Sequence, residues 1–344
     1  PSNPPIQGSL PPGIYPITGP QLPAYGVVQP TALIAGLTML GTMHERIGDT
    51  LTHFSLGDNP DARGWGRLFA QHIEHRYAAY TNPTTDGVLL GFQTGQDIFR
   101  REGAAGDRDA AGFYLAYSRN DLCLDGLVTN ADASGYTRKN VGDLYLTGYS
   151  LAGYWTHYGA DEWYVNGVLQ GTSYNGETQT PNTELALRGN GALASLEIGY
   201  PMKLRQGHNF VLEPQIQGIW QRVNFEEQDD GFGKVDLGTT YMTTVRLGLR
   251  WLWTLSSEDG KIWQPYARVN YWRDWSGDAV TRFDGDSVPL VIHGERMEYA
   301  GGLSVKTSEH LSFYAQGGIQ HGIGEADHEN QRAFIGNLGL RYEW

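Results

Sequence analysis

The stretch FIGNLGLRYEW, residues 334–344, decides the fold. Large apolar side chains share one parity: Phe334, Leu338, Leu340, Tyr342 and Trp344. The other parity carries Ala333, Ile335, Asn337, Gly339, Arg341 and Glu343. An alternation with a period of two residues indicates a β-strand between two different solvents. Because it continues to the last residue, where a soluble domain would usually fray, it predicts an outer-membrane β-barrel closed by its C-terminal strand.

The average composition fits a membrane barrel better than a bundle of membrane helices. Hydrophobic residues make up 40% of the 344 residues, and the mean hydropathy is −0.42. In a barrel, lipid-facing and lumen-facing residues alternate, so the apolar and polar contributions cancel in the average. The 20 tyrosines and 10 tryptophans fit the aromatic girdles that barrels place at both membrane surfaces.

Charge and cysteine content exclude several classes of function. A net charge of −13 argues against a nucleic-acid partner, because phosphate binding needs clustered Lys and Arg. The single cysteine, Cys123, excludes an intrachain disulfide and a Cys-rich metal site. The only candidate membrane helix, residues 27–43, is shorter than the ~20 apolar residues that a span needs and contains Gln29 and Pro30. No signal peptide is visible, so we expect a mature or excised fragment.

Three regions follow one another along the chain. Residues 1–25 are rich in Pro and Gly and predict an extended linker without its own core. In residues 26–48, leucines at helical spacing predict a helix that Gly48 can end. A helix of about 18 residues is ~27 Å long, close to the height of a bilayer core. Residues 62–344 hold the alternating segments of the predicted barrel.

About twelve segments alternate, and most are longer than strands of globular proteins. Their spans are 64–76, 86–99, 109–124, 141–156, 161–174, 184–200, 209–225, 236–255, 262–275, 289–305, 311–321 and 331–344. Connections after odd-numbered segments read as long, for example LVTNADASGYTRKN, and those after even-numbered segments as mostly short, for example SSEDGK. Membrane barrels have short periplasmic turns and longer extracellular loops, so we expect both barrel ends of the chain in the periplasm.

The cost of placing charge in lipid decides which parity points inward. An Arg that faces lipid at the midplane costs ~2–4 kcal/mol, so the polar parity must line an aqueous lumen. The predicted lumen-lining residues are Arg67, Gln93, Asp97, Glu197, Glu213, Gln215, Gln217, Arg246, Arg250, Arg268, Asn270, Arg296, Glu298 and Gln316. Charges of both signs suggest that something polar fills the lumen, and the helix is the nearest candidate. The segment at 141–156 has tyrosines on both parities, so its faces are not assigned.

Several motifs, in this order and spacing, resemble the C-terminal translocator β-domain of type Va autotransporters, closest to the pertactin-like and BrkA-like group. They are GTMHERIGD, RGWGRLFAQ, YVNGVLQGTSY, LEPQIQGIWQRV, VRLGLRW, QPYARVNYWRDW and LGLRYEW. The resemblance covers residues 25–344. It implies an all-β fold, a twelve-stranded antiparallel transmembrane barrel with an N-terminal α-helix inside the pore. It also implies type V secretion in a Gram-negative bacterium, a route associated with virulence.

The resemblance further implies partners and site residues. The barrel would export its own N-terminal passenger, with residues 1–25 as the end of that passenger, and anchor it through the helix. The pore-helix residues would be Leu33, Leu37, Leu40, His44, Glu45 and Arg46. The outer-membrane assembly machinery would recognise Phe334, Leu338, Leu340, Tyr342 and Trp344. Periplasmic chaperones and lipid or lipopolysaccharide complete the expected partners.

The chain departs from the family pattern at three points. Trp344 stands where the family often has Phe, although its aromatic character is kept. The segment IYPITGPQLPAYGVV lacks the acidic residue expected near the helix entry. No Asn–Asn pair occurs in the helix, so self-cleavage of the passenger is not predicted.

Other functions fit the sequence less well than secretion. A porin-like diffusion channel needs an open lumen, and the helix pattern counts against it. His72 and His75 could not share a metal ion on a strand, because residues three apart face opposite sides. The sequence GYSLAG around Ser150 lacks the strand–turn–helix context of a nucleophile elbow. We therefore expect neither an enzyme nor a cofactor; a soluble β-sandwich would have shorter strands.

Overall fold

The computed structural model of the chain describes residues 18–48, 63–203, 209–257, 260–276, 279–292, 294–308, 310–323 and 330–343. Fourteen strands form one antiparallel sheet, and two of them, β7 (Met202–Lys203) and β12 (Leu255–Ser256), are two residues long. The other twelve are β1 (Arg63–Arg76), β2 (Thr84–Glu102), β3 (Arg108–Thr129), β4 (Tyr136–Tyr158), β5 (Tyr164–Gln179), β6 (Glu184–Gly199), β8 (Phe210–Phe225), β11 (Thr239–Trp253), β13 (Ile262–Ser276), β16 (Gly294–Lys306), β17 (Leu311–Gly322) and β18 (Asn330–Glu343).

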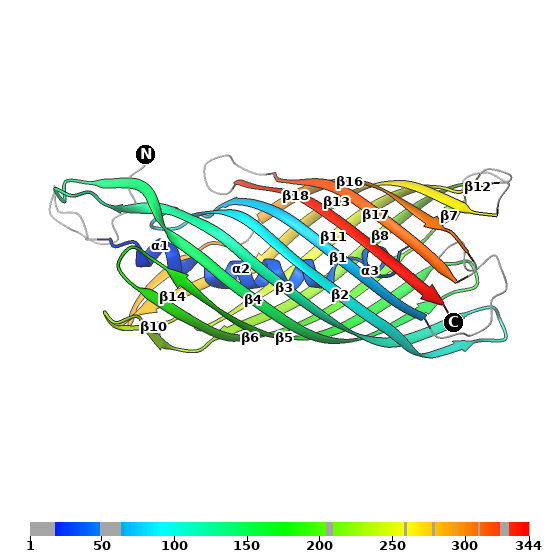
Figure 1. Ribbon diagram of the computed structural model, residues 1–344, viewed down its shortest axis with the longest axis horizontal. Coiled ribbons are helices and arrows are strands. Elements are labelled where there is room, and N and C mark those ends of the chain that lie inside the picture. Colours follow the sequence, from blue (N-terminus) through cyan, green and yellow to red (C-terminus); the bar gives the residue numbers. More distant parts are fainter. Residues whose placement is uncertain are drawn as a thin grey trace.

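The sheet closes on itself, so each long strand has two long neighbours. The last strand, β18, pairs with the first, β1, over the whole length of both, and β8 pairs with β11. Leu68 lies opposite Leu338 at the middle of the β1–β18 pair. The result is the tilted barrel of Figure 1, and it confirms the predicted twelve-stranded antiparallel barrel.

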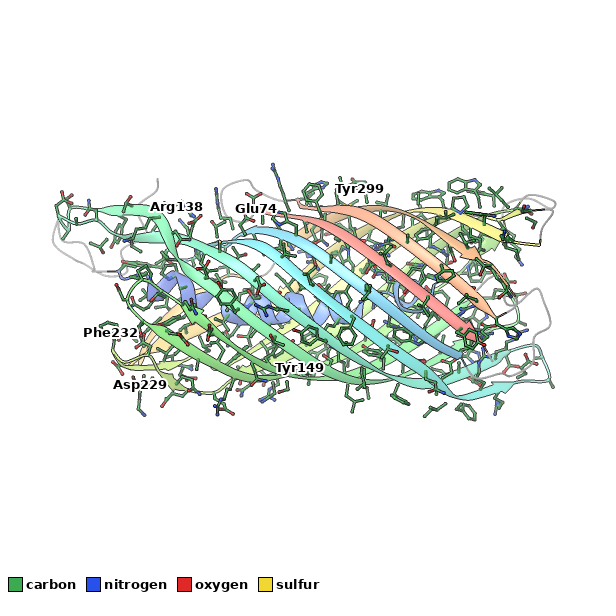
Figure 2. The ribbon with its side chains drawn as sticks, in the orientation of Figure 1. Glu74, Arg138, Tyr149, Asp229, Phe232 and Tyr299 are labelled. Carbon is green, nitrogen blue, oxygen red and sulfur yellow. The ribbon has the colours of Figure 1, made fainter. Side chains whose placement is uncertain are left out.

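A broad apolar belt surrounds the outside of the barrel. Leu169 is 70% exposed and Phe334 64% exposed, which would be unfavourable in water. Leu68, Leu90, Leu115, Leu151, Leu196, Ile216, Leu247, Ile319 and Leu338 are also exposed. Aromatic rings accompany the belt, and Figure 2 shows Tyr149 and Tyr299 on the outer surface. An apolar belt with aromatic residues is the outer surface of a transmembrane barrel.

The two ends of the barrel differ, and we name them after the helices that lie there in Figure 1. At the α1 end, two connections fold into a second sheet of four short strands. These are β9 (Gln228–Asp229), β10 (Lys234–Asp236), β14 (Ala279–Phe283) and β15 (Asp286–Leu290), in the order β15-β14-β10-β9. At the α3 end lie the short turns 103–107 and 159–163 and the paired ends of β1 and β18.

The predicted alternation of loop length is wrong at two of the connections. Most of LVTNADASGYTRKN is strand, because β3 runs to Thr129 and β4 starts at Tyr136, so the hairpin projects from the α1 end (Figure 1). The connection 180–183 is as short as the turns of the α3 end. Outside a bilayer a strand pair can extend into water, so a polar stretch can continue the ladder instead of forming a loop.

Three helices occupy the lumen: α1 (Gln21–Gly26), α2 (Val28–Leu40) and α3 (Met43–Ile47). Among the residues that the structure describes, none of the helices combines the length and the apolar character needed to cross a bilayer. Pro23 and Pro30 lie in the first turns of α1 and α2, where a missing backbone N–H costs little. Residues 21–25, predicted as extended linker, are therefore helical.

The predicted single helix to residue 47 is interrupted at Gly41. This residue has a φ of +59°, and a Cβ there would lie 2.3 Å from Nη1 of Arg67. Only glycine fits this conformation and this close approach. Thr42 then starts α3 through a capping box with Glu45, and Gly48, with a φ of +70°, ends it as predicted.

Glycines on the inner wall let aromatic rings lie flat against the neighbouring strand. A Cβ at Gly339 would lie 2.0 Å from Cζ of Tyr314, and a Cβ at Gly199 would lie 2.3 Å from Cε1 of Tyr164. The missing side chain therefore creates the space that each ring fills. Both tyrosines point toward α3, so these glycines help to position the contacts described next.

Candidate functional site in the barrel lumen

Helix α2 lies lengthwise in the lumen and packs against one side of it (Figure 1). Its apolar side chains, including Val28, Leu33 and Met39, are at most 1% exposed. They share one apolar core with inward residues of β3, β4, β6 and β8: Leu122, Leu124, Leu144, Leu146, Leu185, Leu187 and Ile219. A helix that is apolar on every side must be surrounded by protein. The prediction that a polar segment fills the lumen is therefore wrong along α2 and holds only near α3.

At the α1 end, the four-stranded sheet holds the beginning of the helical segment. Tyr25 donates a hydrogen bond of 2.9 Å to Oδ2 of Asp230, and its ring stacks on Phe283 at 6.0 Å between centroids. Burial and the Asp230 carboxylate raise the pKa of the Tyr25 phenol, so the donor stays protonated. Gln29 donates to the carbonyl of Leu237 and accepts a 2.6 Å hydrogen bond from Thr240.

At the α3 end, three consecutive residues, His44, Glu45 and Arg46, form what we call the anchor triplet. All three are buried. His44 Nε2 lies 2.7 Å from Oε1 of Glu213 on β8. Arg46 donates to Oδ1 of Asn166 on β5 at 2.5 Å and to the carbonyl of Leu40 at 2.9 Å. His44 and Arg46 thus contact one side of the wall, on the two strands that flank β6.

Glu45 makes the largest number of contacts in the triplet. Its carboxylate lies 2.5 Å from Nη2 of Arg268 and accepts hydrogen bonds from Gln316 at 3.1 Å and Asn337 at 3.4 Å. Nη1 of Arg67 lies 4.0 Å away. These three hydrogen-bond donors and the more distant Arg67 come from β13, β17, β18 and β1, so the carboxylate lies where the first and last strands meet.

The backbone of α3 is held as well. The hydroxyl of Tyr314 donates to the carbonyls of Glu45 and Arg46 at 2.6 and 3.0 Å, and Arg341 donates to the carbonyl of Ile47 at 3.3 Å. The N–H of Met43 donates to Glu197 at 3.0 Å. Side chains of the wall therefore satisfy helix-end groups that would otherwise need water.

A belt of paired charges surrounds α3. Glu197 lies 3.1 Å from Arg246, and both are 0% exposed. Glu213 lies 3.4 Å from Arg250 and accepts a 2.7 Å hydrogen bond from Gln215. Buried charges persist only when partners surround them, and here each has several.

The structure places the other predicted lumen residues on the inner wall too. Gln93 donates to the carbonyl of Met39 at 3.0 Å. Asp97 accepts a 2.7 Å hydrogen bond from Tyr154 and stands apart from the anchor triplet. The remaining pairs are Gln217 with Arg246 at 2.9 Å, Asn270 and Arg268 with Glu298 at 2.9 and 2.7 Å, and Arg296 with Asp274. Leu33 and Leu40 are buried, and Leu37 is partly buried.

Five residues that hold α3 are absent from the predicted site residues: Tyr164, Asn166, Tyr314, Asn337 and Arg341. Tyr314 and Asn337 fall on the inward parity of segments whose faces the alternation assigns. The alternation therefore predicts that both side chains point into the lumen. It does not mark them as site residues, because tyrosine and asparagine carry no charge. Tyr164 and Asn166 lie in the strand β5, whose inner face holds few charges.

A cavity of about 90 Å³ remains between α2 and the wall on the β1–β18 side. Leu37, Gln71, Trp272, Arg296 and Asn337 are among its lining residues. The helix thus occupies most of the lumen, and the open lumen that a diffusion channel needs is absent in the described part of the chain.

The described residues of the predicted assembly signal point outward and are part of the apolar belt. Phe334, Leu338, Leu340 and Tyr342 are 45–64% exposed on β18. Trp344 lies outside the described residues, as do residues 1–17 of the predicted linker.

The two motifs that were considered for metal binding or catalysis, His72 with His75 and the segment around Ser150, both lie on strands, as their spacing indicates. His72 faces outward and His75 inward. Ser150 faces the lumen and shares a 2.7 Å hydrogen bond with Thr172. In the part of the chain that the structure describes, Asp107, Asp109 and His157 form the one group with metal-ligand spacing, at the α3 end. Arg101 lies 3.7 Å from Asp109 in this group and opposes a cation there.

Comparison with known proteins places this architecture in a family. The family model for the autotransporter beta-domain matches residues 64–318. The BrkA autotransporter of Bordetella pertussis is 27% identical over 266 residues, which cover 74% of this chain and 24% of BrkA. The chain thus spans about a quarter of the length of that relative.

Two solved structures share the fold. The β domain of Bordetella BrkA has a TM-score of 0.63 at 21% identity and covers 83% of this chain and 100% of that one. The transport unit of the autotransporter AIDA-I of Escherichia coli has a TM-score of 0.68 at 16% identity, with 93% and 99% covered. With the matched family model and the helix-filled barrel, they show that this chain belongs to the autotransporter β-domain family, as an outer-membrane translocator domain.

Proposed function

We propose that the barrel exports a passenger joined to its N-terminus and then retains the end of that passenger through the helical segment. One observation carries the proposal: a helical segment without charge up to residue 43 lies through a closed barrel and is held at both ends. A chain that has passed outward and stopped would leave this arrangement. Residues 26–48 are then the pore helix and tether, and the residues before them are the end of the passenger.

The same proposal orients the barrel. We infer that the α1 end faces the outside and that the α3 end, with both barrel termini, faces the periplasm. The projecting β3–β4 hairpin and the four-stranded sheet support this, because membrane barrels carry their larger connections outside and short turns such as 103–107 in the periplasm.

Assembly partners follow from the exposed surface. The outward row of Phe334, Leu338, Leu340 and Tyr342 on β18 presents the signal for the outer-membrane assembly machinery. Periplasmic chaperones would shield the apolar belt before insertion, and lipid or lipopolysaccharide would cover it afterwards.

Orientation is tested by labelling cells with a membrane-impermeant maleimide. In a Cys123→Ala background, which removes the exposed native thiol, Ser134→Cys marks the β3–β4 tip and Ala105→Cys marks the β2–β3 turn. We expect label at position 134 in intact cells and at position 105 only after permeabilisation. The reverse pattern would overturn the orientation.

Export is tested by placing two cysteines in a passenger fused ahead of residue 1. A disulfide formed in the periplasm closes a folded loop that cannot pass the lumen as an extended chain, so surface display should fall and recover when a reductant is added. Equal display with and without the disulfide would contradict passage of an extended chain.

A further inference from the structure

The four donors around Glu45 form a built receptor for a carboxylate, and we call Arg67, Arg268, Gln316 and Asn337 the carboxylate site. Each donor is at most 8% exposed. Together they supply two guanidinium groups and two amides, which are buried hydrogen-bond donors suited to a carboxylate.

Each donor stands on a barrel strand, and contacts other than the one to Glu45 hold three of the four side chains. Gln316 accepts a 3.0 Å hydrogen bond from Tyr266, and Arg67 donates to the carbonyl of Thr38 on α2 at 2.6 Å. Gln316 and Asn337 lie opposite each other in the β17–β18 pair. Arg268 is also held by Glu298, at 2.7 Å, and Arg67 lies over the ring of Phe69 at 4.8 Å. The site is therefore preorganised, and a ligand would not have to order it.

The wall beside the site carries an excess of positive charge. Among the described residues of β1 and β18, three arginines point inward: Arg63, Arg67 and Arg341. One carboxylate, that of Glu343, and the imidazole of His75 also point inward on these two strands. When α3 is not docked, Arg67 loses the carboxylate of Glu45, which lies 4.0 Å from its Nη1. A lumen with low-dielectric walls and unbalanced positive charge attracts anions.

The helical segment offers only one group to this site. No residue from 1 to 43 carries a charged side chain, so Glu45 is the first carboxylate of the printed chain. Before α3 reaches its final place, the site is open to the lumen through which a translocating chain moves.

We propose that the carboxylate site binds acidic side chains of the polypeptide that passes through the lumen, and that Glu45 is its final occupant. The inference rests on the proposed export function, and it names the chemistry that the pore recognises in its substrate: Asp and Glu side chains. Binding is transient, because each acidic residue is replaced by the next until Glu45, supported by the rest of the anchor triplet, stays.

The test uses acetate as the probe and the full chain with Glu45→Ala, which empties the site. At an acetate concentration about ten times its Kd, the ratio of folded to unfolded protein should rise about elevenfold, seen as a higher melting temperature than in chloride of equal ionic strength. Wild-type protein should show no such rise. The double variant Glu45→Ala/Arg268→Gln should lose it. His44→Ala, which empties a site beside the carboxylate of Glu213, is the matched control and should not respond to acetate.

A second measurement avoids the risk that Glu45→Ala does not fold. The chain that starts at Asp58 lacks the helical segment, so its carboxylate site is open to the lumen, and its single-channel current is recorded with hexaglutamate or hexalysine added. If hexaglutamate blocks the current for longer than hexalysine, and Arg268→Gln removes this difference, the result supports the site. Equal block by both peptides would overturn the site. A folded Glu45→Ala protein that does not respond to acetate would also overturn it. If acetate stabilises Glu45→Ala but the barrel fails to display a passenger, the export function is refuted and the carboxylate site stands. Failure of the proposed site and failure of the proposed export function can therefore be told apart.

Discussion

The pair formed by Glu197 and Arg246 offers the sharpest test of how the α3 end is held. Both side chains are 0% exposed and lie 3.1 Å apart. Glu197 also accepts hydrogen bonds from Tyr164 at 2.9 Å and from the N–H of Met43. Removing one charge leaves the other buried and unpaired, which costs about 3–5 kcal/mol of unfolding free energy. Glu197→Gln and Arg246→Gln should each lose about this amount.

The double variant separates a buried pair from a hydrated one. With both charges gone no unpaired ion remains, so Glu197→Gln/Arg246→Gln should lose no more than either single variant, a coupling of about 3 kcal/mol. The assay is equilibrium unfolding of the barrel in lipid vesicles by denaturant, followed by tryptophan fluorescence. Single losses below about 1 kcal/mol with coupling below about 0.5 kcal/mol would show a water-filled lumen at this level and refute the reasoning.

Two further substitutions test the wall itself. Gly339→Ala forces the ring of Tyr314 away from the carbonyls that its hydroxyl binds, so the free energy of unfolding should fall by about 1–3 kcal/mol. Gly336→Ala on the same strand meets open space and should change the stability little. Similar melting temperatures for the two variants would contradict the role of this contact. Leu338→Arg puts a charge in the middle of the apolar belt and should cost about 2–4 kcal/mol in vesicle unfolding. Ser134→Arg, at the exposed tip of the β3–β4 hairpin, should stay within about 0.5 kcal/mol. Equal effects of the two substitutions would place the belt elsewhere.

Much of the barrel could be predicted from alternation because lipid and lumen impose opposite demands on the two faces of a strand. The prediction works best on β8, β11, β13 and β17, where inward polar residues oppose outward apolar ones. It gives no answer for β4, and the structure supplies the reason. Inward Leu144 and Leu146 pack on α2 while outward Tyr149 and Leu151 face lipid, so both faces are apolar and no alternation appears.

The details of the helical segment escaped prediction for a different reason. The break at Gly41 has a local signal, a glycine followed by the capping box of Thr42 and Glu45, but the helical spacing of the apolar residues on both sides masks it. The start of α1 at Gln21 depends on packing of Tyr25 against the four-stranded sheet, whose strands come from connections about 200 residues away. Local propensity does not contain such long-range contacts.

The same limit applies to the site. The charged lumen residues could be listed because charge excludes them from lipid. Their convergence on the anchor triplet could not be foreseen, since it depends on strand register and on the position of α3 along the barrel. Donors without charge, such as Tyr314 and Asn337, were missed for the same reason.

The central claim is that the helical segment plugs a pore wide enough for an extended chain. Single-channel conductance in planar bilayers tests it directly, with the full chain compared with a chain that starts at Asp58. We expect low, flickering conductance from the full chain, because α2 lies lengthwise in the lumen and a cavity of about 90 Å³ remains beside it, and large, steady conductance from the shortened chain. Large and equal conductance from both chains would contradict the plug and favour a diffusion channel.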